Sequence, residues 1–323
     1  MALPMLLLLL ASSFSFIPSS QSSALTFDYY AKTCPKFEQI LTGIVREKQQ
    51  EFPTTAAATL NLFYHDCAVG GCDASVLIKS TAFNKAEMES DDNRSLGGDG
   101  FDVIQRVKLA LELECPDTVS CADILAVATR NLVTQVGGPH YNVLLGRKDG
   151  TQSKAASVAG HFPRANSTVD QIIKIFKSQG FTVPEMVVLT GGGHTIGFAH
   201  CKEFADRIFG PHPDPTMNPS LAGGLRTLCA AYKNNTAMAA FLDPITPTTF
   251  DNTYFKNLQN GLGILGSDQI LTRDPRTKPF VEKYAKDAAV FAKDFSYAIE
   301  KLSVLQVKTG DEGEVRKRCD LPN

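Results

Sequence analysis

The sequence predicts an all-α protein, and three observations support this class. Apolar residues recur at helical spacing through most of the chain, few runs alternate with period two, and glycine or proline interrupts the periodic segments. With 323 residues, 43% of them hydrophobic, the chain can bury a substantial core in one large domain or two packed lobes. A formal charge of −2 excludes a general attraction to nucleic acid or to an anionic membrane.

The first 24 residues predict a secretory leader. A short leucine run is followed by a small, polar stretch that ends near Ala24, where we expect cleavage. The apolar run is shorter than the roughly 20 residues that a membrane span needs, so export is favoured over a membrane anchor. Residues 25–323 then form the mature domain, with neither a nucleic-acid nor a membrane partner expected.

Four helices are predicted in the first half. Residues 35–50 carry an apolar stripe at helical spacing, and residues 54–68 form an alanine-rich run that begins after Pro53. The polar, glycine-containing segment 81–100 predicts a long loop. Helices resume at residues 101–113 and 120–136, the latter with Ser120 as its N-cap and Asp123 as the acidic third residue.

The second half is also predicted to be helical, after an irregular stretch over residues 141–163 where we place a junction. A periodic segment at 168–178 has Ser167 as a candidate cap and Gly180 as its stop. Further helices are expected at residues 185–189, 198–209, 221–229, 250–260 and 279–302.

The cysteines predict an oxidising compartment. An even number behind an export signal favours four disulfides over buried free thiols, and the lack of any CxxC spacing argues against zinc. The count alone leaves 105 pairings open. Sequons at Asn166 and Asn234 also suit a glycosylated, exported product. The eight cysteines are Cys34, Cys67, Cys72, Cys115, Cys121, Cys201, Cys229 and Cys319.

Two of the six histidines stand out by their surroundings. His65 lies four residues after Asn61, so both side chains project from one face of a predicted helix. His194 follows three glycines, which remove bulk beside the imidazole, as a flat cofactor would require. Taken singly, each is more readily explained as an ordinary helix residue. The histidines expected to be surface or packing residues are His140, His161, His200 and His212.

Several segments together resemble the secreted plant haem peroxidases, the class III family. They are YHDCAVGGCDASVLI, VSCADILAVATR, GRKDG, GGGHTIGFAHC, TPTTFDNTYF and SDQ. The resemblance runs from about Phe27 to Cys319, and all eight cysteines fall where that family has them. It implies a two-lobed helical fold with haem b between a distal-side lobe, roughly residues 25–160, and a proximal-side lobe, roughly residues 161–323.

The resemblance implies a monomeric enzyme that reduces hydrogen peroxide and oxidises small phenolic donors in one-electron steps, in the cell wall or the vacuole. His194 matches the proximal ligand of the haem iron, and Asp268 matches the carboxylate that accepts its other N–H. His65 matches the distal acid–base, and Asn93 matches the amide that fixes its tautomer. Asn93 also begins a sequon, and glycosylation there is not expected if it faces the pocket.

The sequence departs from the family pattern at several positions. Asn61 stands where the family has an arginine that stabilises negative charge on the departing oxygen, and losing such a donor costs about 10²–10³ in rate in other enzymes. We therefore expect slow activation of peroxide. Tyr64 and Ala68 replace usual phenylalanines, and Tyr141 replaces a usual tryptophan. The glycine run before His194 is one residue longer, a change able to shift this ligand locally.

The resemblance also implies two calcium sites, whose oxygen ligands suit a hard ion. The residues matching a distal site beside His65, with Val69 and Gly71 acting through carbonyls and Glu87 through water, are Asp66, Val69, Gly71, Asp73, Ser75 and Glu87. Those matching a proximal site beside His194 are Thr195, Asp243, Thr246, Thr249 and Asp251. Without the neighbouring histidines, these acids would be interpreted as ordinary loop and cap residues.

Of the pairings that the cysteine count leaves open, the resemblance selects Cys34–Cys115, Cys67–Cys72, Cys121–Cys319 and Cys201–Cys229. Pro163 matches the residue at the haem-edge opening where aromatic donors bind, although a simple loop proline is the alternative. Two other hypotheses stay open. Asn61 favours a secreted haem-binding protein that scarcely turns over, and the histidines and acids are also compatible with a non-haem metal in a structural wall protein.

Overall fold

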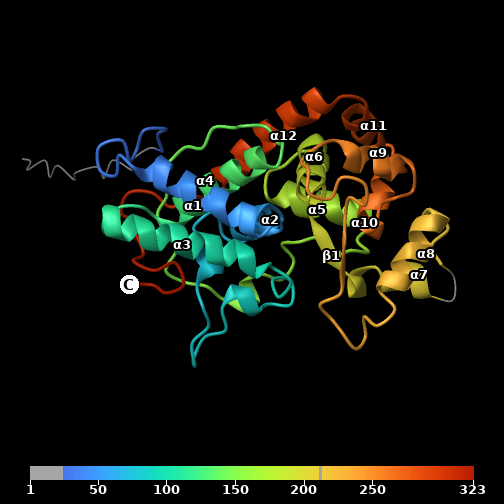
Figure 1. Cartoon of the computed structure of the whole chain (residues 1–323), viewed down its shortest axis with the longest axis horizontal. Coiled ribbons are helices and arrows are strands. Elements are labelled where there is room, and N and C mark those ends of the chain that lie inside the picture. Colours follow the sequence, from blue (N-terminus) through green and yellow to red (C-terminus); the bar gives the residue numbers. More distant parts are fainter. Residues whose placement is uncertain (1–24, 211–212) are drawn as a thin grey trace, which may run out of the picture.

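The computed structural model describes residues 25–210 and 213–323, and helices predominate within them, which confirms the all-α class (Figure 1). The predicted leader and His212 lie outside the described residues. The α-helices are α1 (Phe37–Glu51), α2 (Thr55–Ala68), α3 (Gly98–Glu114), α4 (Cys121–Gln135), α5 (Val169–Ser178), α6 (Val183–His194), α7 (Ala205–Phe209), α8 (Pro219–Leu228), α9 (Thr253–Gln259), α10 (Gly266–Gln269), α11 (Lys278–Lys286) and α12 (Ala288–Ser303). Two short strands, β1 (Phe198–His200) and β2 (Ala239–Phe241), pair antiparallel.

Helices α1 to α4 gather in one half of the molecule and α5 to α11 in the other, while α12 extends between them (Figure 1). The main hydrophobic core draws on both halves, with buried residues from α1 to α4, α6, α9, α11 and α12. A second, smaller core lies under α7, α8 and the two strands. Among the described helices, none combines the length and the apolar character that crossing a bilayer requires.

Most predicted helices are confirmed, with ends that differ by a few residues. Ser120 is the N-cap of α4 as expected, because its Oγ accepts the N–H of Asp123 at 3.2 Å. The predicted cap of α5 is wrong. Thr168 caps that helix in a reciprocal pair of bonds with Gln171, whereas Ser167 bonds the backbone of the preceding turn.

Three helix predictions are wrong, one because of a distant contact and one because of a local cap. The segment 198–209 begins as β1, whose partner strand lies about 40 residues later, and only its end is the short α7. The segment 279–302 is two helices, because Asp287 interrupts it and accepts the N–H groups of Ala289 and Val290 as the cap of α12. Helix α6 does not end at Leu189 but continues to His194, and the four-residue α10 was not predicted.

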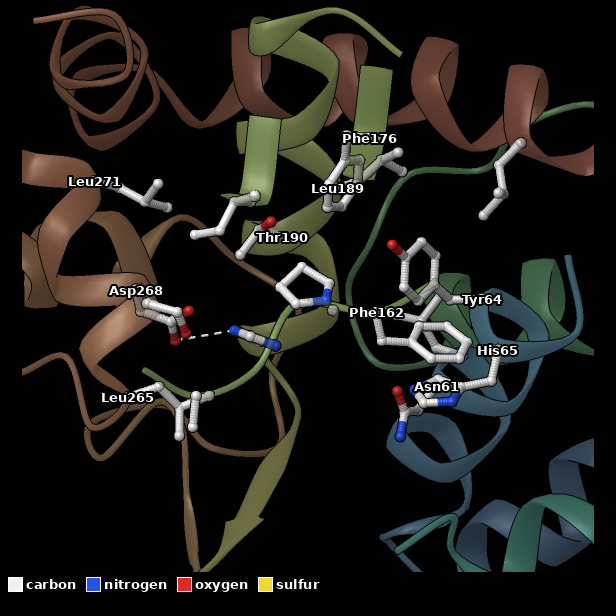
Figure 2. A pocket seen from close by; sticks show the side chains of 18 of the residues that line it. Asn61, Tyr64, His65, Phe162, Phe176, Leu189, Thr190, Leu265, Asp268 and Leu271 are labelled. Carbon is white, nitrogen blue, oxygen red and sulfur yellow. Dashed lines mark hydrogen bonds and ion pairs between the residues drawn. The ribbon is translucent and has the colours of Figure 1, made fainter. Parts of the chain in front are cut away.

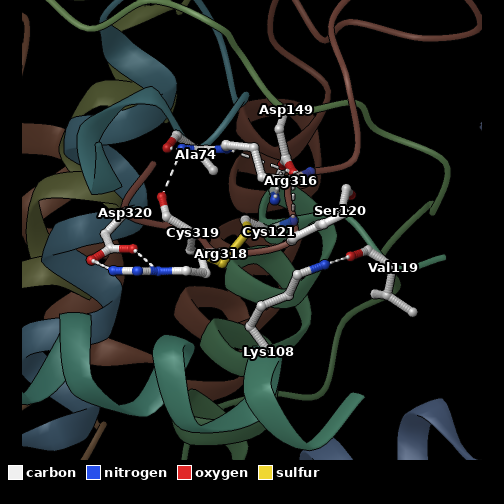
Figure 3. The surroundings of a disulfide bond; sticks show 12 residues. Ala74, Lys108, Val119, Ser120, Cys121, Asp149, Arg316, Arg318, Cys319 and Asp320 are labelled. Atoms are coloured by element: carbon white, nitrogen blue, oxygen red, sulfur yellow. Dashed lines mark hydrogen bonds and ion pairs between the residues drawn. A yellow bond between two sulfur atoms is a disulfide. The ribbon is translucent and has the colours of Figure 1, made fainter. Parts of the chain in front are cut away.

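The four disulfides pair as the resemblance implied: Cys34–Cys115, Cys67–Cys72, Cys121–Cys319 and Cys201–Cys229. The Cys121–Cys319 bond joins the start of α4 to the end of the chain, across 198 residues of sequence (Figure 3). Beside it, the buried Arg316 donates to the carbonyls of Ala74 and Cys319, at 2.7 Å each. The last residues are therefore built into the core of the first half.

A fully buried ion pair links the junction segment to the same core. Arg147, in the GRKDG segment, donates from Nη1 to Asp123 Oδ1 at 2.8 Å, and neither side chain is exposed. Asp123 Oδ2 also accepts the Tyr30 hydroxyl and the Gly146 N–H, each at 2.7 Å. Because a buried carboxylate needs compensation for its lost hydration, this cluster depends on the guanidinium.

Breaking this pair is expected to destabilise the fold strongly. Arg147→Met leaves the Asp123 carboxylate buried without its cation, so the free energy of unfolding should fall by about 3–5 kcal/mol in urea titrations. The matched control is Arg106→Met, because Arg106 holds Asp102 at 2.8 Å with half of its side chain exposed, and that loss should stay below about 1 kcal/mol. Equal losses in the two variants would contradict the assignment.

Candidate functional site

A cavity of about 190 Å³, partly open to solvent, lies where α2 and α6 face each other. Both His65 and His194 line it, and the wall between them is largely apolar (Figure 2). The main apolar lining residues are Leu60, Phe162, Ile172, Phe176, Leu189, Leu265, Leu271, Phe295 and Ile299.

His65 projects from α2 into this cavity, and its orientation is fixed from behind. Its Nδ1 lies 2.7 Å from Asn93 Oδ1, while the Asn93 amide Nδ2 donates to the Glu87 carbonyl at 3.0 Å. Because the amide is committed in this way, its oxygen accepts the proton of Nδ1, and Nε2 carries a lone pair. Burial lowers the pKa of His65 to about 4, so the imidazole is neutral at neutral pH.

His194 is the last residue of α6 and lies on the opposite side. Its Nδ1 donates to Asp268 Oδ2 at 2.9 Å, a bond drawn as the dashed line from Asp268 in Figure 2. Asp268, from α10, is 2% exposed. Burial alone would lower the pKa of His194, but the charge and hydrogen bond of Asp268 outweigh it, so the pKa is raised. The ring edge of Tyr254 also packs against the imidazole.

The two imidazoles share one arrangement that suits a flat porphyrin. Each has Nδ1 occupied by a partner in the protein, and no described residue bonds either Nε2. Gly193, beside His194, also lines the cavity, and a Cβ there would meet nothing within 4 Å. These residues fit a metal-bearing macrocycle between the histidines, ligated by the Nε2 of His194.

Two of the three glycines before His194 let α6 pack closely against its neighbours. The helix is continuous through them, and His194 still meets Asp268, so the longer glycine run does not displace the contact. A Cβ at Gly191 would lie 2.1 Å from the ring of Phe255, and one at Gly192 would lie 2.1 Å from the ring of Phe295. Close packing against these rings explains why glycine remains helical here.

The residues that depart from the family pattern near His65 are Asn61, Tyr64 and Ala68, and they lie on the same helix, α2. Asn61 lines the cavity one turn before His65, and its side chain has no hydrogen-bond partner among the described residues. Phe162 stacks on the His65 ring, with centroids 3.9 Å apart, and shares a small apolar cluster with Ala68. The ring of Phe162 therefore takes up space beside the small Ala68. The Tyr64 hydroxyl is buried without a partner among the described residues, and burial raises its pKa.

Some of these site residues carried no usable sequence signal. Phe162 follows a loop histidine and precedes a proline, so neither periodicity nor a motif marks it. Tyr254 lies within the quoted TPTTFDNTYF segment, which was the only indication of its position. Pro163 itself lines the cavity beside Phe162. Asn93 is 2% exposed and faces His65, so its sequon is inaccessible in the folded chain.

The residues of the distal calcium set lie together beneath α2. Asp66 Oδ2 accepts the Ala74 N–H at 2.9 Å, Asp73 Oδ1 accepts the Ser75 N–H at 3.0 Å, and the Ser75 hydroxyl donates to Glu87 at 3.3 Å. Burial and the neighbouring carboxylates raise the pKa of Asp66, and burial raises that of Glu87 to about 7. The ammonium of Lys308, which sequence reasoning missed, contacts Asp73.

The proximal calcium set is likewise brought together beside His194. Asp243, with no exposed surface, accepts the N–H groups of Ile245 and Thr246 at 2.8 and 2.9 Å. The Thr246 hydroxyl lies 3.2 Å from Asp251 Oδ1, and the Thr195 hydroxyl donates to the Asp251 carbonyl at 2.9 Å. Thr249 contributes its carbonyl, 3.5 Å from the same hydroxyl. Within residues 25–210 and 213–323, no group of three or more His, Cys, Asp or Glu side chains has metal-binding geometry.

Comparisons with known proteins agree with this geometry. The family model described as peroxidase matches residues 41–287. Peroxidase 41 of Arabidopsis thaliana is 58% identical over 308 residues, which cover 94% of each chain. Peroxidase 65 of the same plant is 55% identical over 94% of this chain and 91% of its own length. Peroxidase 63 is 51% identical over 99% of this chain and 97% of its own length.

The packing of α6 gives a prediction with an internal control. Gly192→Ala forces the Phe295 ring to move, so the free energy of unfolding should fall by about 1–3 kcal/mol. Gly43→Ala, on α1 and away from the cavity, adds the same methyl group where nothing lies within 4 Å, so the better helix propensity should leave stability unchanged or raise it by up to about 1 kcal/mol. Urea unfolding of the purified protein measures both, and a stable Gly192→Ala variant would show that the close contact is wrong.

Proposed function

The chain belongs to the class III plant peroxidase family and is a haem peroxidase, and we propose that it is exported and oxidises small phenolic donors at a rate limited by Asn61. The proposal depends on one observation above all: two imidazoles, fixed by Asn93 and Asp268, face one cavity with Nε2 of each unbonded by any described residue. Since haem is the cofactor of the family, the hypothesis of a non-haem metal in a wall protein is set aside.

The overall reaction consumes one hydrogen peroxide and two donors, AH, and yields two waters and two donor radicals, A•. Bound haem supplies an iron that takes up the oxidising equivalents of peroxide and passes them to donors one at a time. His65 supplies the proton transfer. Its Nε2 takes the proton of peroxide and returns it to the departing oxygen, which leaves as water.

The surroundings of His65 match this role. Asn93 holds the proton on Nδ1, so that Nε2 is available as the base. The lowered pKa keeps the imidazole unprotonated over the neutral and mildly acidic range. On the other side, Asp268 draws the Nδ1 proton of His194 and makes the ring a more electron-rich ligand, which favours cleavage of the O–O bond.

The donor is proposed to bind at the edge of the cavity beside Pro163, where electrons reach the cofactor without direct contact with the iron. Export is proposed from the leader pattern in residues 1–24, with the cell wall or the vacuole as destination and a monomer as the working form. A boundary between distal-side and proximal-side lobes is placed near residue 160, within the irregular segment before α5.

An absorption spectrum before and after addition of peroxide tests the function directly. The purified protein should show a Soret band. In stopped-flow mixing with peroxide, the Soret band of the protein should change faster than the Soret band of free haem does. A rate no faster than free haem would favour the second candidate, a haem-binding protein with little turnover, which the Asn61 side chain supports. Protein that contains no porphyrin and takes none up would overturn both.

Restoring a cation at position 61 is expected to accelerate the reaction with peroxide. Asn61→Arg places five fixed N–H donors one helical turn from His65, where negative charge develops on the departing oxygen, so the second-order rate constant should rise by about 10²–10³. Asn61→Lys tests the effect of a positive charge without the planar array of donors. Asn61→Leu measures how much the Asn61 amide itself contributes to the rate constant. An unchanged rate in Asn61→Arg would mean that this position does not face the bound peroxide.

Removal of calcium is expected to lower the melting temperature of the haem-loaded protein. We propose that Ca²⁺ occupies both oxygen-rich sets, since each buries carboxylates beside a catalytic or ligand histidine. At a concentration 100 times its dissociation constant, one bound ion adds about 2.7 kcal/mol to stability. Treatment with EGTA should remove this gain, and Ca²⁺ should restore it better than Mg²⁺, which prefers a tighter octahedral site.

Two variants test the calcium assignment. Asp243→Asn should reduce the stabilisation that added Ca²⁺ produces, whereas Asp170→Asn, at an exposed acid on α5, should leave it unchanged. Elemental analysis that finds no calcium, together with a melting temperature indifferent to EGTA, would exclude both sites.

A further inference from the structure

One exposed charged side chain, that of Arg164, lines the cavity. Apart from the histidines, the lining residues with a formal charge are Arg164 and Asp268. Asp268 is buried and bonded to His194, whereas the Arg164 side chain is 62% exposed. A donor that enters beside Pro163 therefore meets the guanidinium of Arg164 before any other charged group of the lining.

The backbone of Arg164 is held in place from both sides. Its N–H donates to Ser167 Oγ at 2.8 Å, and its carbonyl accepts the Ser167 N–H at 2.9 Å, which closes a tight turn. The carbonyl of the next residue, Ala165, accepts the N–H of Ser267 at 2.8 Å. Ser267 precedes Asp268 on α10, so this turn is anchored to the proximal side of the site.

The side chain of Arg164 is anchored to the distal side. Its Nη1 lies 2.6 Å from Asp92 Oδ1, and Asp92 immediately precedes Asn93, the partner of His65. Asp92 is only 11% exposed, so its carboxylate is largely covered while the guanidinium faces outward. No further acceptor bonds this guanidinium among the described residues. Since arginine has five N–H donors, most of them are available to a second carboxylate.

The neighbours of Arg164 provide an apolar surface of aromatic size. Pro163 is partly exposed, Phe162 lies stacked on His65, and Ile172 and Phe176 complete this side of the lining. A planar ring can pack on this surface while a charged group a few bonds away reaches the guanidinium. The juxtaposition is specific to an aromatic molecule that carries an acid.

We propose that Arg164 is a specificity-determining residue that selects phenolic donors bearing a carboxylate on a short side arm, as in 4-hydroxycinnamate. This inference rests on the proposed oxidation of phenols and names the class of donor. Because Asp92 neutralises the guanidinium at long range, selection acts through direct hydrogen bonds at the opening rather than through attraction from a distance.

The experiment measures the oxidation of a charged and an uncharged donor by hydrogen peroxide, catalysed by the haem-loaded full chain. The donors are 4-hydroxycinnamate and its methyl ester, which share the phenol and differ in charge. Arg164→Gln should raise the KM for the acid about three- to tenfold, the range expected for a solvent-exposed, charge-assisted contact. The KM for the ester should change less than about twofold, and kcat should change little for either donor.

Arg94→Gln is the matched control. Arg94 has the same exposed fraction, 62%, and pairs with Asp91 at 3.3 Å on the loop that also carries Asp92, but it does not line the cavity. Removing the Arg94 guanidinium should leave the KM for the acid and the KM for the ester as they are in the parent protein. Arg164→Lys keeps the charge without the planar array of N–H donors. Its KM for the acid should lie between those of the parent protein and of Arg164→Gln.

The possible outcomes distinguish failure of the proposed role of Arg164 from failure of the proposed peroxidase function. Equal rises in KM for acid and ester would show that Arg164 only holds the loop, and unchanged values in Arg164→Gln would exclude any contact; either result overturns the proposal while the peroxidase assignment stands. A parent protein that oxidises neither donor faster than free haem would remove the proposed function itself. A Soret band and circular dichroism matching the parent confirm that each variant is loaded and folded.

Discussion

The chemistry of this protein depends on how each of two imidazoles uses its two nitrogens. In both, Nδ1 is bonded to a side chain of the protein and Nε2 is directed to a common cavity. The two partners differ in charge, and that difference separates the roles. Burial keeps His65 uncharged and the neutral amide of Asn93 fixes its tautomer, whereas the carboxylate of Asp268 increases the electron density of His194.

The remaining structure can be understood as support for these two orientations. Asn93 is held by the carbonyl of Glu87, and Glu87 belongs to the buried acidic group directly beneath α2. On the other side, Thr195 follows His194 and bonds the loop that carries Asp251. Each imidazole is thus connected within a few bonds to a cluster of buried oxygen atoms. Any ion bound to those clusters would restrain the histidines without touching them.

The residues themselves were sufficient for the class of fold, and their resemblance to the family supplied the cysteine pairs and the set of site residues. The helix prediction failed where a distant partner decides the local structure, as at β1. The alanine-rich segment 54–68, which contains His65, is helical by propensity as well as by packing, so its prediction is confirmed. Gly191 and Gly192 weaken a helix locally, and the aromatic rings that pack against them come from α9 and α12. The strand at Phe198 depends on Phe241, and Phe162 reaches His65 only through the folded loop.

The late position of Arg316 and Cys319 in the sequence has a consequence for how the molecule is made. Both residues complete the core around Ala74 and Cys121, so the first half remains unfinished until they have left the ribosome. Until Cys319 has been synthesised, Cys121 lacks its native partner, which lies 198 residues later, and it can form disulfides with nearer cysteines instead. Synthesis therefore favours a compartment in which premature bonds are reshuffled. A chain truncated before Arg316 would lack these contacts with the half that carries His65, although residues 25–135 of that half had been translated.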